Sequence, residues 1–181
     1  MSINKNELAN YKSLNSLARK NSVVILGANY MKEMPVGELK QVFGIISDIY
    51  NRSLSDLSVF EARPILEDII TQLCPKKIIL QLGETDLEKG TDVDKVIAEV
   101  SSLLNTIKKM DRSLKIVLVS INNLTNKQIE TEFNIRLSSI CTGSKVQFAD
   151  ITSAASDDSC RIQTFRLLRY FMSDDMLLQI M

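Results

Sequence analysis

The segment IILQLGETDLEKGTDVDKVIAEVSSLLNTIKKM, residues 78–110, contains a short apolar run, a glycine turn and a long amphipathic pattern. The run KIILQLG at residues 77–83 is almost continuously apolar, which is typical of a strand covered on both faces of a parallel sheet. In residues 92–110 the apolar side chains recur three and four positions apart, which predicts a helix with one buried stripe. We expect Thr91 to cap this helix, with Asp94 three residues later completing a capping box. The segment therefore predicts one strand–helix unit of an α/β fold.

The same alternation continues on both sides of this unit. Short apolar runs predict three more buried strands and a weaker fifth, at residues 22–27, 115–121, 146–151 and 45–50. Helical patterns fall between them, at residues 7–19, 36–43, 65–73, 126–140 and 161–170. Strands that alternate with helices predict a three-layer α/β/α sandwich with a mostly parallel five-stranded sheet. We expect one domain over residues 1–181, with residues 1–20 as a helical extension.

Composition excludes several classes of protein. The 22 basic and 22 acidic residues balance, so there is no excess of positive charge for binding nucleic acid. No apolar run approaches the roughly 18 residues that a membrane span needs. The first residues have no apolar core of a secretory signal, so we expect a cytoplasmic protein. The spacing of the three cysteines, Cys74, Cys141 and Cys160, suggests neither a disulfide framework nor a zinc site. We interpret them as buried structural thiols because their neighbours are apolar and no histidine can activate a thiol.

The chain contains no histidine. This absence excludes imidazole metal ligands and every catalytic pair of a nucleophile with histidine. We therefore expect no metal and no cofactor. A serine–lysine pair would need no histidine. Lys32 and Lys89 follow strand ends, but neither has a serine in a matching nucleophile turn, so we do not expect that chemistry.

Four segments, in this order, resemble the conserved blocks of the SGNH (GDSL) hydrolases. They are VVILGANYMKEMP at residues 23–35, YNRSLSDL at 50–57, IILQLGETDL at 78–87 and SDDMLL at 173–178. The resemblance covers roughly residues 22 to 178 and implies the flavodoxin-like sandwich of that family and ester or acyl hydrolysis. It also implies that the closing helix usual in the family is absent.

The residues at the family's catalytic positions differ from those that the chemistry needs. The resemblance places Asn29 at the serine nucleophile, Ser53 and Thr85 at two oxyanion-hole positions, Asp174 at the acid and Leu177 at the histidine. A carboxamide does not supply the activated oxygen of a serine nucleophile, and leucine cannot accept a proton. We therefore predict a catalytically inactive protein. The alternative is an enzyme of the same fold that acts through a relocated catalytic group.

Polar and glycine residues at the strand ends could instead form a cleft for a small acylated molecule. The predicted ligand-binding residues are Gly27, Asn29, Asn51, Ser53, Gly83, Thr85 and Asp86. Ligands of open α/β sheets bind at this edge. Glu84, Asp86, Asp174 and Asp175 could also gather there as an acidic pocket for a cation. The preferred interpretation is that Asp86 caps or braces a loop and that the other carboxylates are solvated. A second copy of the chain or an active SGNH relative is a further expected partner.

Overall fold

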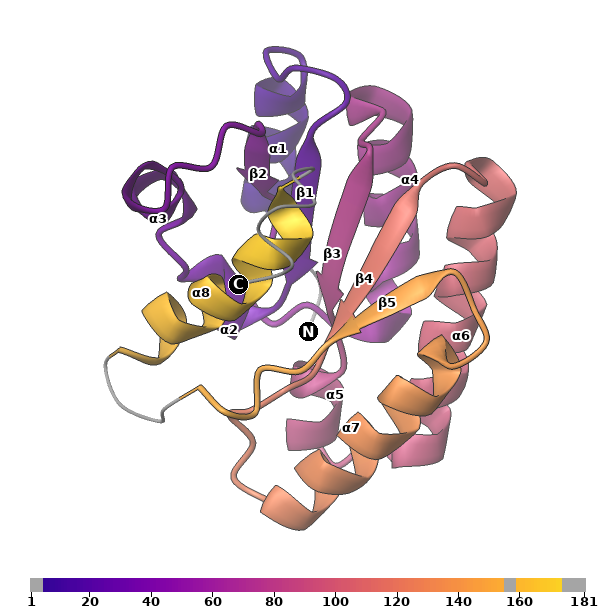
Figure 1. Cartoon of the computed structure of the whole chain (residues 1–181). Helices are drawn as coiled ribbons and strands as arrows, with labels where there is room; N and C mark the ends of the chain where they lie inside the picture. The colour runs from indigo at the N-terminus through magenta and orange to yellow at the C-terminus, as the bar shows by residue number, and fades with distance from the viewer. Residues whose placement is uncertain (1–4, 155–158, 174–181) are drawn as a thin grey trace.

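The computed structural model describes residues 5–154 and 159–173 (Figure 1). Five strands form one sheet in the order β2-β1-β3-β4-β5, and every neighbouring pair is parallel. The strands are β1 (Val23–Gly27), β2 (Ile49–Asn51), β3 (Lys77–Gln81), β4 (Lys115–Val119) and β5 (Val146–Ala149). The α/β sandwich predicted from the alternating patterns is therefore confirmed, with a sheet that is parallel throughout.

One face of the sheet is covered by the longer helices (Figure 1). They are α1 (Lys5–Asn15), α4 (Ala62–Leu73), α6 (Val93–Met110) and α7 (Lys127–Cys141), with the short η1 (Val59–Glu61) and α5 (Glu84–Glu88) near the strand ends. Leu66, Leu103 and Phe133 from this layer pack on Val24 and Leu80 of the sheet. The amphipathic stripe of α6 thus faces the core, as its periodicity predicts.

The opposite face carries α2 (Asn29–Lys32), α3 (Val36–Val42) and α8 (Cys160–Met172). Met31, Phe165 and Leu168 are fully buried there against Ile25 and Ile79 of the sheet. Because successive strand residues point to opposite faces, β1 and β3 supply both cores, and their continuous apolar runs follow from this double burial.

Several local predictions are wrong in their bounds. The strand expected at residues 45–50 begins only at Ile49, because Ile45 belongs to the core beneath α3 while Ile46 is 91% exposed. The helix expected at residues 7–19 ends at Asn15. Asp92, and not Thr91, caps α6, since its Oδ1 accepts from the N–H of Asp94 at 2.9 Å.

The prediction of buried cysteines is correct for Cys141 and wrong for Cys74, which is exposed; Cys160 is half-buried. Cys74 follows α4 with a φ of 43°, so the chain turns out of the helix at this residue and its thiol lies at the surface. Over residues 5–154 and 159–173, no helix has the combination of length and apolarity that crossing a bilayer requires.

Candidate functional site

The loops that follow β1, β2, β3 and β4 meet at the carboxyl edge of the sheet. From β1 the chain passes to β2 on one side of it, and from β2 it crosses to β3 on the other side of β1. Such a switch point is where α/β sheets place their ligands. Gly27 ends β1 in close contact with the next helix, because a Cβ on it would lie 2.8 Å from Cβ of Met31 and 2.9 Å from the carbonyl oxygen of Gln81. The end of β1 is therefore packed tightly against α2 and the end of β3.

Asn29, which the resemblance places at the nucleophile position, forms a reciprocal pair with Asp56. Its Nδ2 donates to Oδ1 of Asp56 at 2.8 Å, and its Oδ1 accepts from the Asp56 N–H at 3.1 Å. Asp56 has a φ of 52°, which aims its backbone N–H at this amide. Both polar ends of the Asn29 side chain are thus used to join the loops after β1 and β2.

The second loop is held by Asn51 and by α1. The Asn51 side chain donates to the carbonyl of Met31 at 2.7 Å and accepts from the Ser53 N–H at 3.1 Å. The Tyr11 hydroxyl donates to the carbonyl of Ser53 at 2.8 Å. The backbone N–H of Ser53, which the resemblance places among the oxyanion donors, is therefore already engaged by the side chain of Asn51 at the end of β2.

The Ser53 side chain is fully enclosed, and its Oγ has no hydrogen-bond partner within the described part of the chain. A buried hydroxyl without a partner is uncommon in native proteins. The Ser53 hydroxyl is thus a buried polar group that the described residues leave without a hydrogen bond.

Glu7 of the N-terminal helix fastens the same loop from outside. Its carboxylate accepts from the N–H and the hydroxyl of Ser55, at 3.1 and 3.0 Å, and forms an ion pair with Lys32. The Lys32 ammonium lowers the pKa of Glu7 below its ordinary value, and both hydrogen bonds from Ser55 act in the same direction. Lys32 Nζ also lies 2.5 Å from Ser55 Oγ. The sequence did not predict this serine–lysine contact, because Lys32 ends α2 and Ser55 lies in the loop after β2.

The third loop begins at Gly83, which has a φ of 104° and caps α5. Thr85 and Asp86 follow it and are buried. Asp86 accepts from Ser58 Oγ at 2.5 Å and from the Val59 N–H at 2.8 Å, so its carboxylate holds the start of η1. Asp86 therefore braces a loop, which is the alternative to a role in an acidic pocket for a cation.

Glu84 points the other way, toward the end of β4. Its Oε1 accepts from Nδ2 of Asn123 at 2.6 Å, while its Oε2 and the Oδ1 of Asn123 have no hydrogen-bond partner among the described residues. Burial raises the pKa of Glu84, and the nearby carboxylate of Glu88 adds to this rise. The hydrogen bond from Asn123 opposes the rise, as does the Tyr30 N–H. A buried carboxyl group with a raised pKa is a feature of many functional sites.

The carboxylates of Glu84 and Asp86 thus diverge. Asp174, Asp175 and Leu177 lie outside the described residues, so the structure does not place the fourth block. Within the residues that it does place, no three histidine, cysteine, aspartate or glutamate side chains are grouped to hold a metal ion. The roles of the seven predicted ligand-binding residues stay predictions.

No model of a known protein family matches this chain, and no curated protein sequence does. Solved structures match well. A protein from Streptococcus pneumonia, provisionally named a platelet activating factor, aligns with a TM-score of 0.76 and 15% identity over 93% of this chain and 92% of its own. A GDSL-like lipase from Bacteroides thetaiotaomicron aligns with a TM-score of 0.73 and 12% identity over 91% and 96% of the two chains.

A family 3 carbohydrate esterase from Clostridium thermocellum aligns with a TM-score of 0.71 and 12% identity, covering 90% of this chain and 99% of its own. At such identities the likeness shows the fold. The five-stranded parallel sandwich described above is the fold of the SGNH (GDSL-like) hydrolases.

Proposed function

We propose that this chain, which has the fold of the GDSL-like hydrolases, is a catalytically inactive member of that fold that binds a ligand or a partner. The reciprocal pair of Asn29 and Asp56 carries this proposal. A hydrolase of this kind needs an oxygen nucleophile with a base beside it. The residue at that position is instead a carboxamide whose two ends both join one loop to another, and the chain has no histidine to act as the base.

The oxyanion positions support the same proposal. The Ser53 N–H is bonded to Asn51, and Thr85 lies buried in α5. Losing one oxyanion donor costs roughly 100- to 1000-fold in turnover. Losing the nucleophile or the base of a triad costs about a millionfold. Together these losses predict a rate of ester hydrolysis that cannot be distinguished from background.

Hydrolysis of p-nitrophenyl acetate by protein purified without a polyhistidine tag tests the proposal. The tag would add imidazole, which cleaves such esters by itself. We expect the rate to equal that given by the same mass of an unrelated protein. A rate well above this blank that survives repurification would contradict inactivity.

For the binding role we propose a small acylated molecule at the carboxyl edge of the sheet, or a protein partner there, either a second copy or an active relative. The strand order supports a ligand at this edge, because open α/β sheets bind ligands where neighbouring strands connect in opposite directions. Calorimetric titration with acetylated sugars and short acyl esters tests the small ligand. We expect Asn29→Ala to weaken binding and Asn105→Ala, at an exposed position of α6, to leave it unchanged. If no compound gives a heat of binding, the small ligand is excluded and a protein partner is the binding role that is left to test.

A second candidate function, an enzyme with relocated chemistry, is favoured by one contact. Ser55 Oγ lies 2.5 Å from Nζ of Lys32 and could pass its proton to that amine while attacking an acyl carbon. The contacts of Lys32 oppose this chemistry, because its amine donates to both Glu7 and Ser55, whereas a base would have to accept the Ser55 proton. A fluorophosphonate adduct mapped to Ser55 and absent from Ser55→Ala would favour this candidate. An unlabelled protein would argue against it.

A further inference from the structure

A second polar site lies at the opposite, amino-terminal edge of the sheet. A pocket of about 320 Å³ opens there beside the start of β4. Leu114 and Ile116, both buried, form its apolar floor. Lys108 comes from the last turn of α6, Arg112 from the connection to β4, and Lys145 from the turn before β5. These five residues are called the basic pocket below.

The three cations of the basic pocket have no counter-charge among the residues that the structure describes. None of them forms a hydrogen bond or an ion pair with a residue that the structure describes, and no described carboxylate lines the pocket. The nearest carboxylate in sequence, Asp111, accepts from the N–H and the hydroxyl of Ser113, at 2.8 and 2.6 Å. Like charges that converge without a counter-charge repel one another, so an anion bound between them gains their combined attraction.

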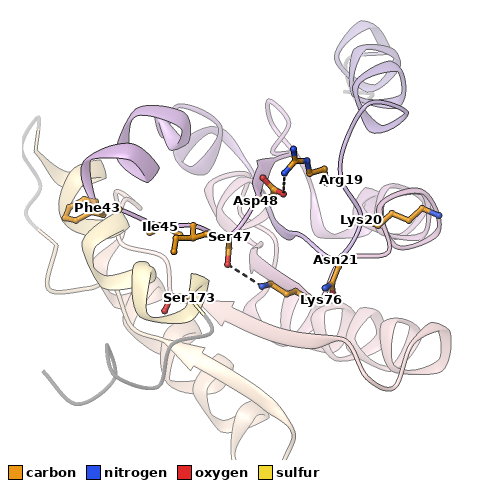
Figure 2. Close-up of a pocket in the computed structure, with 11 residues that line it drawn as sticks. Arg19, Lys20, Asn21, Phe43, Ile45, Ser47, Asp48, Lys76 and Ser173 are labelled. Atoms are coloured by element: carbon orange, nitrogen blue, oxygen red, sulfur yellow. Dashed lines mark hydrogen bonds and ion pairs between the residues drawn. The ribbon is translucent and has the colours of Figure 1, made fainter.

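A larger pocket on the same edge differs in this respect (Figure 2). It has a volume of about 570 Å³, and Arg19 lies 3.7 Å from the carboxylate of Asp48 within it. Figure 2 shows the two side chains pointing toward each other, while Lys76 reaches Ser47. The positive charge of this larger pocket is therefore partly compensated by the carboxylate of Asp48, whereas no described carboxylate lines the basic pocket.

Lys108 also lies close enough to the buried Cys141 thiol to affect its pKa. Burial raises the pKa of the Cys141 thiol, and the positive charge of Lys108 acts against this rise. Cys141 ends α7, and Lys145 follows in the turn that leads to β5. Lys108 at the end of α6 and Lys145 before β5 therefore bring positive charge to the same apolar floor from two separate elements. The attraction of lysines to the carboxyl end of α6 alone would not account for Lys145.

We propose that the basic pocket binds a phosphate monoester with a small apolar body. A phosphate monoester carries about −1.5 to −2 charges at pH 7, which matches three cations better than a single carboxylate does. The planar guanidinium of Arg112 can hold two phosphate oxygens at once, and lysine ammonium groups act as point charges on the others. Leu114 and Ile116 would contact the apolar body. The volume lies at the lower end of the range for small-molecule sites.

Calorimetric titration of the whole protein with n-hexyl phosphate tests the proposal, with hexan-1-ol and inorganic phosphate as separated halves of the ligand. We expect n-hexyl phosphate to bind more tightly than either half, and its affinity to fall with rising ionic strength. The double substitution Lys108→Gln with Lys145→Gln should weaken binding roughly tenfold, as expected for the loss of two exposed charge pairs. Lys109→Gln, next to Lys108 but outside the pocket, should leave the affinity unchanged.

The same phosphate chemistry occurs in free metabolites and in lipid headgroups, and a second arm separates them. Flotation with phosphatidylcholine vesicles that contain phosphatidic acid, and with vesicles that lack it, reports the lipid source. Recruitment by phosphatidic acid that is lost in the double variant assigns the pocket to a lipid headgroup. Binding of n-hexyl phosphate without recruitment assigns it to a free ester. The proposal is overturned if neither binds, if hexan-1-ol binds as tightly as its phosphate, or if Lys109→Gln weakens binding as much as the double variant.

Discussion

Replacing Gly83 with alanine tests the packing of the third loop. Gly83 has a φ of 104°, in the region that residues with a Cβ rarely adopt. An added Cβ would lie 2.8 Å from Cζ of Phe133 and 3.1 Å from Cγ1 of Val96. Phe133 is fully buried between α7 and the sheet, so its ring has little freedom to withdraw.

The size of the effect follows from two costs and one gain. A left-handed backbone costs an alanine about 1–2 kcal/mol, and overpacking a filled core costs about 1–3 kcal/mol. Alanine restricts the unfolded chain and returns about 0.4–1 kcal/mol. We expect a net loss of about 2–4 kcal/mol in the free energy of unfolding. This corresponds to a fall of roughly 4–16 °C in Tm for a domain of this size.

Urea denaturation followed by circular dichroism measures the loss, and two other glycines separate its causes. Gly90 has a φ of 80° but open space around its Cα, so Gly90→Ala should cost only about 1 kcal/mol, from the backbone alone. Gly37 lies in α3 with neither feature, so Gly37→Ala should stabilise the protein by about 0.5–1 kcal/mol. If Gly83→Ala costs no more than Gly90→Ala, Phe133 and Val96 do not crowd Gly83, and the reasoning is refuted.

Three further predictions concern buried or paired carboxylates. Burial raises the pKa of Glu84, so the folded state binds its proton more tightly, and stability should fall as pH rises from the ordinary glutamate value through the raised pKa. Glu84→Gln should remove that fall in Tm measured against pH, whereas Glu67→Gln, at an exposed position of α4, should not. Asp86→Ala leaves the Val59 N–H without its partner and should cost about 1–3 kcal/mol in urea denaturation; no change would contradict the brace. The pKa of Glu7 is lowered, so its ion pair stabilises at neutral pH, and Glu7→Gln should cost about 1 kcal/mol there after allowance for solvent screening. The variant and the native protein should converge in acid, and a difference independent of pH would refute the role of the charge.

The sequence by itself determines the elements and the edge of the sheet at which to look for the site. Continuous apolar runs such as that of β3 identify strands buried on both faces, and the spacing of three and four identifies α6, because both patterns depend on neighbouring residues alone. Boundaries are less well predicted where two signals compete. Ile45 and Ile46 look like a strand, yet only the packing beneath α3 decides that one is buried and the other exposed.

The tertiary structure alone decides what the residues of the candidate site contact. Asn29 pairs with Asp56 and Glu84 with Asn123, across 27 and 39 residues of chain. No local pattern contains these pairings, because they arise only when parallel strands align their ends and bring loops together. A match to a family block can therefore place Asn29 at a nucleophile position. Only the fold shows that its amide is already used to hold one loop to the next, because hydrogen bonding between distant loops depends on geometry and not on order in the chain.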